Sequence, residues 1–284
     1  MHDENQGSWL HVQRGVAPLL VCMPHTGTLI PSPIAAQLVS PWLARKDTDW
    51  WIERLYAFAA DLGATLIRTD VSRSVIDANR DPSGVSLYPG QATTELCPTT
   101  TFDGEPLYGP GAAPGPAEIA ARRAQYFEPY HRAIGEELRR LRGTHRAVVL
   151  YDCHSIRSQI PRLFAGVLPH FNIGTNSGAS GDAALLRRIE ALCDASGLTR
   201  VTDGRFRGGY TTRHYGAPQH GTHAVQMELA CRGYLREPVG EVDVASWPCA
   251  YDEDFAAPLR TLLAQVLEAC LAFAARNARP PGSG

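Results

Sequence analysis

The stretch from Val148 to Ser155 constrains the fold of this chain more than any other. Four apolar or aromatic residues, Val148 to Tyr151, predict a short buried strand, and Asp152, His154 and Ser155 follow at its end. In α/β proteins, ligands and reacting groups gather where strands end and loops begin. A histidine there can bind a metal ion or a substrate through one ring nitrogen while a neighbouring residue orients the other. Taken alone, a histidine hydrogen-bonded within a loop explains the pattern equally well.

Strand-like and helix-like stretches alternate along the rest of the chain. Apolar or alternating runs predict further strands over residues 18–23, 64–68, 162–171 and 224–229. Helical patterns predict a helix from residue 50 to Gly63 and others over 117–142 (kinked at Pro129), 182–196 and 255–275. The alternation predicts an α/β fold. Because no stretch is a strong boundary, we expect a single domain over residues 1–284.

The composition excludes several classes of partner. The formal net charge is −2 and no basic run occurs, so neither nucleic acid nor an anionic membrane surface is expected to bind. No apolar segment is expected to reach the roughly 18–20 residues that span a bilayer. The N-terminal Met1–Gln6 segment is polar and acidic, unlike a secretory leader. The seven cysteines form no Cys-x-x-Cys pair, which favours a reducing compartment, so a cytoplasmic location is expected.

A second histidine lies at the end of another predicted strand, and two aspartates lie at the start of the first predicted helix. His25 follows the strand predicted over 18–23 and precedes a turn at Gly27, whereas Asp47 and Asp49 precede the first predicted helix. Either aspartate can cap that helix. The helix does not need both, so the other carboxylate can face a site.

Polar residues also gather between residues 71 and 82 and on the last predicted strand. Arg73, Asn79 and Arg80 are close together in the sequence and are flanked by aspartates. The planar fork of arginine matches a carboxylate through two parallel hydrogen bonds. On the last strand, alternation places Glu228 on the face opposite the apolar residues.

A long stretch over residues 83–116 is rich in Gly, Pro and Thr and has little periodicity. Such a run inside a compact domain is usually a functional lid or a disordered linker. Tyr88 and Phe102 are hydrophobic anchors within it and favour a packed covering loop. The glycine-containing stretches over 172–178 and 208–216 read as loops, and the first lacks the lysine and the glycine spacing of a nucleotide-binding loop.

Two strand-end histidines and one acid form a ligand set that catalytic zinc sites use. Such sites commonly bind zinc through two histidines and a carboxylate and leave one position for water. Zinc lowers the pKa of that water to roughly 7, and a further carboxylate can pass its proton to a leaving amine. The candidates are far apart in the sequence and form no local motif, so a structural role for the histidines stays open.

Six blocks of sequence together identify a family. They are Pro24–Gly27, Asp47–Trp50, Ser72–Arg80, Leu87–Gln91, Leu96–Thr99 and Asp152–Ser155. In order and identity they resemble the N-formylglutamate amidohydrolases, or N-formylglutamate deformylases, from about residue 18 to 235. The resemblance implies a fold related to the zinc carboxypeptidases and aspartoacylase, with a mixed β-sheet between helical layers. It also implies hydrolysis of N-formyl-L-glutamate to L-glutamate and formate, the last step of a histidine-degradation route.

The resemblance also implies a metal-binding role for particular residues. His25 and His154 would bind one zinc ion, with Asp49 as the third ligand. The carboxypeptidase pattern places a glutamate where this chain has Thr28, so Asp47 is the alternative carboxylate ligand.

The remaining roles implied by the resemblance concern the reaction and the substrate. Glu228 would be the general base for attack by metal-bound water, and Arg73 would help to polarise the scissile carbonyl. Asn79 and Arg80 would bind a substrate carboxylate. Arg213 resembles the second carboxylate-binding arginine of the acylase relatives.

Two other functions fit the same residues. A related zinc amidohydrolase would act on another N-acyl amino acid, and a non-catalytic protein would bind a dicarboxylate through the arginines without a metal. Cys153 is a poor candidate nucleophile because it and His154, as neighbours in an extended segment, point to opposite faces. His220 and His223 are expected to be structural.

Overall fold

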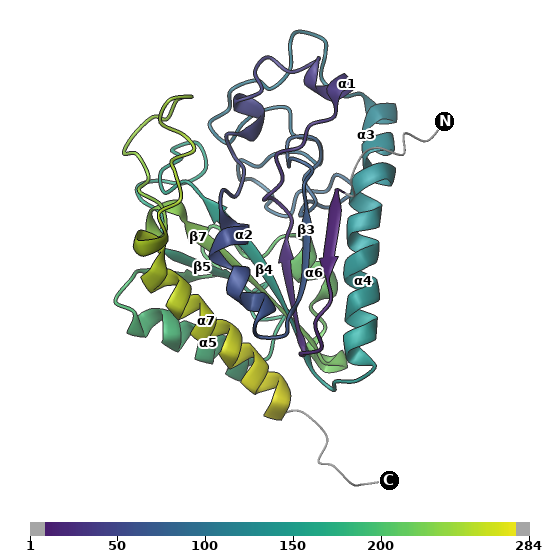
Figure 1. The fold of residues 1–284 in the computed structure, drawn as a ribbon. Coiled ribbons are helices and arrows are strands. Elements are labelled where there is room, and N and C mark those ends of the chain that lie inside the picture. The colour runs from purple at the N-terminus through teal and green to yellow at the C-terminus, as the bar shows by residue number, and fades with distance from the viewer. Residues whose placement is uncertain (1–8, 277–284) are drawn as a thin grey trace.

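A seven-stranded mixed sheet forms the middle of the molecule (Figure 1). The computed structural model describes residues 9–276, so the Met1–Gln6 segment lies outside them. The four central strands are parallel to one another, whereas β1 and β5 run antiparallel to their neighbours β3 and β7. In spatial order the strands are β1 (Leu10–Gln13), β3 (Thr65–Thr69), β2 (Leu19–Met23), β4 (Val148–Ile156), β7 (Thr222–Ala230), β5 (Phe171–Gly174) and β6 (Arg200–Thr202).

Helices cover both faces of the sheet, which confirms the predicted α/β class with a mixed sheet between helical layers (Figure 1). One layer contains α2 (Ile52–Leu55), α5 (Ala183–Ala195) and α7 (Glu253–Arg276), and the other contains α4 (Glu128–Arg142). The remaining helices are α1 (Ser32–Ala35), α3 (Pro116–Arg122), α6 (Tyr210–Tyr215), the 3₁₀ helices η1 (Leu43–Arg45), η2 (Ala57–Ala60), η4 (Pro218–His220) and η5 (Cys231–Gly233), and the π-helical turn η3 (Arg123–Phe127).

Alternate residues of β4 separate the two faces of the sheet. Tyr151 packs in the core beneath α7, whereas Leu150 packs in the core beneath α4. Side chains two residues apart on a strand share a face. The face that begins with Leu150 therefore continues with Asp152 and His154 toward the carboxyl end of the strand. The fold thus buries two polar side chains where an apolar face ends.

The predicted strand over 162–171 is wrong. Only β5, Phe171–Gly174, pairs with the sheet, so the loop predicted over 172–178 begins later than expected. Gly166 has a positive φ of 70° and Pro169 has no N–H to donate, which interrupts an extended ladder. Leu163 instead packs in a small apolar cluster outside the main core. The edge strands β1 and β6 were not predicted, because each is only three or four residues long.

Two further local predictions need correction. The loop predicted over 208–216 contains the helix α6, whose second residue, Thr211, donates its backbone N–H to Asn79 Oδ1 at 2.8 Å. That contact is distant in the sequence, and no local pattern reveals it. The helix predicted from residue 50 to Gly63 is broken into the short helices α2 and η2.

The helix predicted over 117–142 is interrupted ahead of Pro129. It consists of α3, the π-helical turn η3 and α4, and Pro129 lies in the first turn of α4. Proline cannot donate a backbone hydrogen bond to the preceding turn. A wider π turn is a common way to accommodate such a break, so the predicted kink has a physical cause.

The last helix corrects the expectation about apolar segments. The 24-residue α7 contains an 18-residue window with a mean hydropathy of 1.3, enough to cross a membrane by length and composition alone. A share of 39% of that window is buried, and Leu263, Val266 and Leu267 pack in the core against the sheet. Core helices pass the same test, so a single helix of this kind is weak evidence for a membrane span.

Candidate metal centre and active site

Three potential ligand atoms converge at the carboxyl end of the central strands. His25 Nδ1 lies 3.1 Å from His154 Nδ1, and Asp49 Oδ2 lies 3.1 Å from His154 Nδ1 and 3.7 Å from His25 Nδ1. All three residues are buried, with at most 2% of their surface exposed. The structure therefore brings together the two histidines and the aspartate that the sequence singled out.

The backbone explains why residues so far apart in sequence meet. Strand β2 pairs in parallel with β4, so the end of β2 leads directly to His25 beside the end of β4, which bears His154. The backbone N–H of Asp49 donates to the carbonyl of His25 at 3.0 Å. The Ser155 N–H donates to Asp49 Oδ2 at 3.2 Å. Both bonds hold Asp49 against the two histidines.

The outer ring nitrogen of each histidine contacts a buried carboxylate. His25 Nε2 lies 2.8 Å from Asp77 Oδ1, and His154 Nε2 lies 3.0 Å from Asp152 Oδ2. With a proton on each Nε2, the hydrogen bonds to these acids leave both Nδ1 lone pairs free to bind a cation. Metal-bound histidines usually have such a carboxylate partner. Asp77 was not assigned a role from the sequence, although it lies within one of the family-like blocks.

The distances fit a zinc ion. Ligands about 2.0–2.1 Å from a tetrahedral zinc are about 3.3 Å apart, and the three observed separations are 3.1–3.7 Å. Burial alone would lower the pKa of His154, but the carboxylates of Asp152 and Asp49 outweigh it and raise the pKa well above its usual range. Two facing lone pairs and a carboxylate in a buried space favour a positive charge between them. The residues present therefore fit a divalent metal.

Asp47, the alternative carboxylate ligand, faces elsewhere. Its Oδ2 accepts a hydrogen bond from the Phe102 N–H at 2.6 Å, and its Oδ1 lies 3.6 Å from Arg157 Nη2. Asp49, and not Asp47, has a carboxylate oxygen within 4.8 Å of the ligand nitrogens of both histidines. Asp47 instead attaches the long loop to the site.

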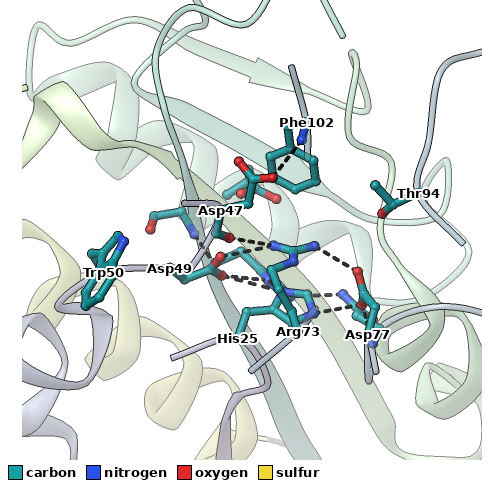
Figure 2. Close-up of polar contacts among 12 residues, drawn as sticks. His25, Asp47, Asp49, Trp50, Arg73, Asp77, Thr94 and Phe102 are labelled. Atoms are coloured by element: carbon teal, nitrogen blue, oxygen red, sulfur yellow. Dashed lines mark hydrogen bonds and ion pairs between the residues drawn. The ribbon is translucent and has the colours of Figure 1, made fainter. Parts of the chain in front are cut away.

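Arg73 is fixed between two carboxylates (Figure 2). Its Nη1 donates to Asp49 Oδ1 at 3.2 Å and its Nη2 donates to Asp77 Oδ2 at 2.8 Å. Burial opposes the charged form, but Asp77 and Asp49 outweigh burial and raise the pKa of Arg73. The ring of Phe102 lies over the guanidinium at 4.7 Å. A permanently charged, immobile guanidinium thus borders the cavity beside the metal ligands.

Glu228 lies beside His154 in the sheet, because the two are paired residues of the parallel strands β4 and β7. Gln226 Nε2 donates to Glu228 Oε2 at 3.1 Å, and Gln226 Oε1 accepts from the Gly209 N–H at 2.7 Å. Burial, reinforced by Asp49 and opposed by His154, raises the pKa of Glu228 to about 7. A carboxyl group with this pKa can accept a proton and release it near neutral pH.

These side chains border a cavity of about 50 Å³. Asn79 is held by the Thr211 N–H, and a Cβ at Gly209 would lie only 2.3 Å from its Nδ2, so the close approach requires glycine. Arg80 Nη2 donates to Thr94 Oγ1 at 3.1 Å. The cavity is lined by His25, Arg73, Asn79, Arg80, Tyr88, Ala92, Thr93, Thr94, Phe102, His154, Ile156, Leu163, Arg205, Phe206, Gly209, Gln226 and Glu228.

Arg205, which the sequence did not single out, lines this cavity, whereas Arg213 does not. Arg205 Nη2 donates to the Ala92 carbonyl at 2.6 Å, and its guanidinium lies over the Tyr88 ring at 5.5 Å. Arg213 donates through Nε to the Gly208 carbonyl and lies over the same ring at 5.3 Å. No motif marks Arg205, because its position depends on the fold of the long loop.

Five residues of the long loop over 83–116 line the cavity: Tyr88, Ala92, Thr93, Thr94 and Phe102. The Tyr88 hydroxyl donates to the Gly208 carbonyl at 2.9 Å and accepts from the Arg207 N–H at 3.2 Å. These bonds tie the loop to the segment before α6.

Comparison with known proteins shows which family this chain belongs to. The model of the family described as N-formylglutamate amidohydrolase matches residues 17–235. The chain is 47% identical to the N-formylglutamate deformylase of Pseudomonas aeruginosa over 265 residues, which cover 93% of this chain and 96% of that protein. It is 45% identical to the N-formylglutamate deformylase of Pseudomonas putida over 269 residues, covering 94% and 97%.

A solved structure shares the fold. The crystal structure of N-formylglutamate amidohydrolase from Ralstonia eutropha JMP134 superimposes with a TM-score of 0.76 at 21% sequence identity. The match covers 94% of this chain and 98% of that one.

Proposed function

Because the chain belongs to the N-formylglutamate amidohydrolase family, we propose that it is a zinc-dependent enzyme that hydrolyses N-formyl-L-glutamate to L-glutamate and formate. The observation that carries the proposal is the convergence of His25 Nδ1, His154 Nδ1 and Asp49 Oδ2 next to the buried carboxylate of Glu228. A protein that only binds a dicarboxylate would need arginines, but it would need neither three converging ligand atoms nor a base.

The metal ligands, Glu228 and Arg73 have different roles in the proposed hydrolysis. A zinc ion held by the three ligands would polarise the formyl carbonyl and lower the pKa of the attacking water. Gln226 Nε2 orients Glu228 by donating to its Oε2, and the Glu228 carboxylate would accept the proton from the attacking water. Glu228 then donates that proton to the amide nitrogen as the C–N bond breaks. Arg73, fixed by Asp49 and Asp77, stabilises the negative charge that develops on the carbonyl oxygen.

The substrate carries two carboxylates, and two cavity arginines can bind them. Arg80 donates a hydrogen bond to the neutral hydroxyl of Thr94, and its Nε, which has no hydrogen-bond partner, lies 3.5 Å from Asp77 Oδ2. A carboxylate at Arg80 would replace one neutral hydrogen bond with charge-assisted ones. We assign the second carboxylate to Arg205, since Arg213 does not line the cavity. A substrate that lacks one carboxylate loses the charge-assisted hydrogen bonds to one of these arginines and should bind more weakly.

The covering loop has to move for the substrate to enter. A cavity of about 50 Å³ is well below the roughly 300–1,000 Å³ of typical ligand pockets. A second cavity of about 360 Å³ shares Arg80, Tyr88, Thr93 and Thr94 with the first. The loop around Tyr88 therefore separates the two spaces, and its outward movement would join them into a path to the ligands. Shortening the loop should raise KM or lower kcat, and unchanged kinetics would contradict the role of a lid.

The experiment that tests the proposed function is direct. Purified protein supplied with zinc should release formate from N-formyl-L-glutamate, and removal of the metal by a chelator should stop the release. Glu228→Gln and His154→Ala serve as controls, and both should lose activity. Wild-type protein that contains zinc and still releases no formate would contradict the proposal.

A further inference from the structure

On the basis of the proposed function, we propose that Phe102 and Ile156 form a wall that limits the N-acyl group of the substrate to formyl. Both side chains line the catalytic cavity, and both also line a small hollow of about 10 Å³ on the side of Asp47 and Trp247. Among the described residues, Phe102 and Ile156 are the two that line both the cavity and the hollow. Phe102 and Ile156 thus form the partition between the cavity and the hollow.

Strand geometry places Ile156 beside the reacting atoms. Ile156 is two residues beyond His154 on β4, so its side chain lies on the same face as that metal ligand. Its pairing partner on β7 is Ala230, two residues beyond Glu228. Ile156 is only 5% exposed. An acyl carbon attacked between His154 and Glu228 therefore meets an aliphatic side chain at the next position along the sheet.

Phe102 closes the same end of the cavity from the covering loop. Its ring lies over the guanidinium of Arg73 at 4.7 Å, and its backbone N–H is bound by the buried Asp47 at 2.6 Å (Figure 2). Arg157 lies 3.6 Å from the other oxygen of Asp47. These contacts hold Phe102 in place, so its ring cannot move aside as easily as a free loop residue would.

The two neighbouring spaces lie at different ends of the catalytic cavity, one beside Arg80 and the other beside Phe102 and Ile156. On one side, Arg80 and Thr94 border the 360 Å³ cavity; on the other, Phe102 and Ile156 border the hollow. A substrate whose carboxylate binds Arg80 and whose carbonyl lies near His154 directs its acyl substituent toward the apolar pair. A formyl group places only a hydrogen there. An acetyl group would have to place a methyl group against Phe102 and Ile156.

Substitution of either wall residue by a smaller one should relax the selectivity. The assay measures kcat/KM for N-formyl- and N-acetyl-L-glutamate with wild type, Phe102→Leu and Ile156→Ala. One methyl group in a well-packed pocket changes selectivity by about 10–200-fold. The ratio of acetyl to formyl kcat/KM should therefore rise at least about tenfold in each variant. Melting temperature and zinc content confirm that each variant is folded, and Ile156→Val replaces Ile156→Ala if the latter is not.

Phe206→Leu is the matched control. Phe206 also lines the cavity, but its ring contacts Arg205 at 5.2 Å and it does not line the hollow. Its substitution should leave the selectivity ratio within about threefold of wild type. If the wild type is specific for the formyl substrate but folded Phe102→Leu and Ile156→Ala variants keep its ratio of acetyl to formyl kcat/KM, the proposed wall is wrong and the proposed function stands. A wild type that prefers the acetyl substrate, or cleaves neither, would overturn the proposed function and the wall with it.

Discussion

Replacement of Asp77 by asparagine tests whether the buried acids next to the histidines serve a metal. Asp77 is completely buried and contacts His25 Nε2 and Arg73 Nη2, each at 2.8 Å, and the Asn79 N–H at 2.9 Å. Asparagine has the same shape, so its oxygen can still accept from His25 and Asn79. Its amide nitrogen would then face Arg73 Nη2, donor against donor. The substitution removes one charge and leaves the packing intact.

The structure sets the size of the expected effects for Asp77→Asn. Loss of a carboxylate partner of a metal-binding histidine lowers metal affinity by about 10–100-fold, or about 1.4–2.7 kcal/mol. Removal of one member of a buried ion pair costs about 3–5 kcal/mol. We expect the lower end, about 3 kcal/mol, because Arg73 keeps Asp49 as a partner and because Arg80, whose Nε lies 3.5 Å from Asp77 Oδ2, is 20% exposed. At about 2–4 °C per kcal/mol, the melting temperature of the metal-free protein should fall by about 6–12 °C.

The assay for Asp77→Asn is a zinc titration in competition with a coloured chelator, together with thermal melting and formate release. Asp70→Asn is the matched control, because Asp70 also contacts a histidine, His11, at 2.5 Å but is 39% exposed and outside the site. The control should keep wild-type zinc affinity. Zinc affinity within threefold of wild type in Asp77→Asn would refute the reasoning that Asp77 orients a ligand.

Three further predictions address the base, the packing of the cavity and the second arginine. Because burial raises the pKa of Glu228 to about 7, a bound cation lowers it again and the base must be ionised, kcat/KM should rise with pH to a plateau with a midpoint no higher than about 7, and a profile that falls as the pH approaches 7 would contradict the assignment. Gly209→Ala should lower kcat/KM because it pushes aside Asn79, whose Nδ2 lies 2.9 Å from Nε2 of the metal ligand His154. Gly135→Ala, where a Cβ meets nothing within 4 Å, should leave activity unchanged and stabilise the helix by about 0.5–1 kcal/mol. Arg205→Ala should raise KM for N-formyl-L-glutamate and lose much of this effect with a substrate analogue that lacks the matching carboxylate; equal losses with every analogue would count against a direct contact.

The sequence predicted the metal ligands because strand ends are recognisable. His25 and His154 each follow an apolar run, and parallel strands bring their ends to the same edge of the sheet. The predicted strand end at Tyr151 is wrong, because β4 continues to Ile156 and His154 lies within its last three residues. The choice between Asp47 and Asp49 could not be made in this way. It depends on the backbone bond from Asp49 to His25 and on the contact of Asp47 with Phe102, both between residues far apart in sequence.

The substrate-binding side of the site was harder to predict. Arg213 was selected because glycines flank it, but its segment forms the helix α6 and its guanidinium lies outside the cavity lining. Arg205 lines the cavity because the covering loop folds back onto it through Tyr88 and Ala92. The conformation of a loop with little periodicity depends on such tertiary contacts, which local patterns do not encode.

The central claim is that His25, Asp49 and His154 bind one metal ion. Anomalous X-ray scattering from a crystal of the protein with zinc tests it most directly. The account predicts one strong peak about 2.0–2.1 Å from His25 Nδ1, His154 Nδ1 and an oxygen of Asp49. Zinc bound through Nε2 of either histidine, or no zinc between the two rings in zinc-saturated protein, would contradict it.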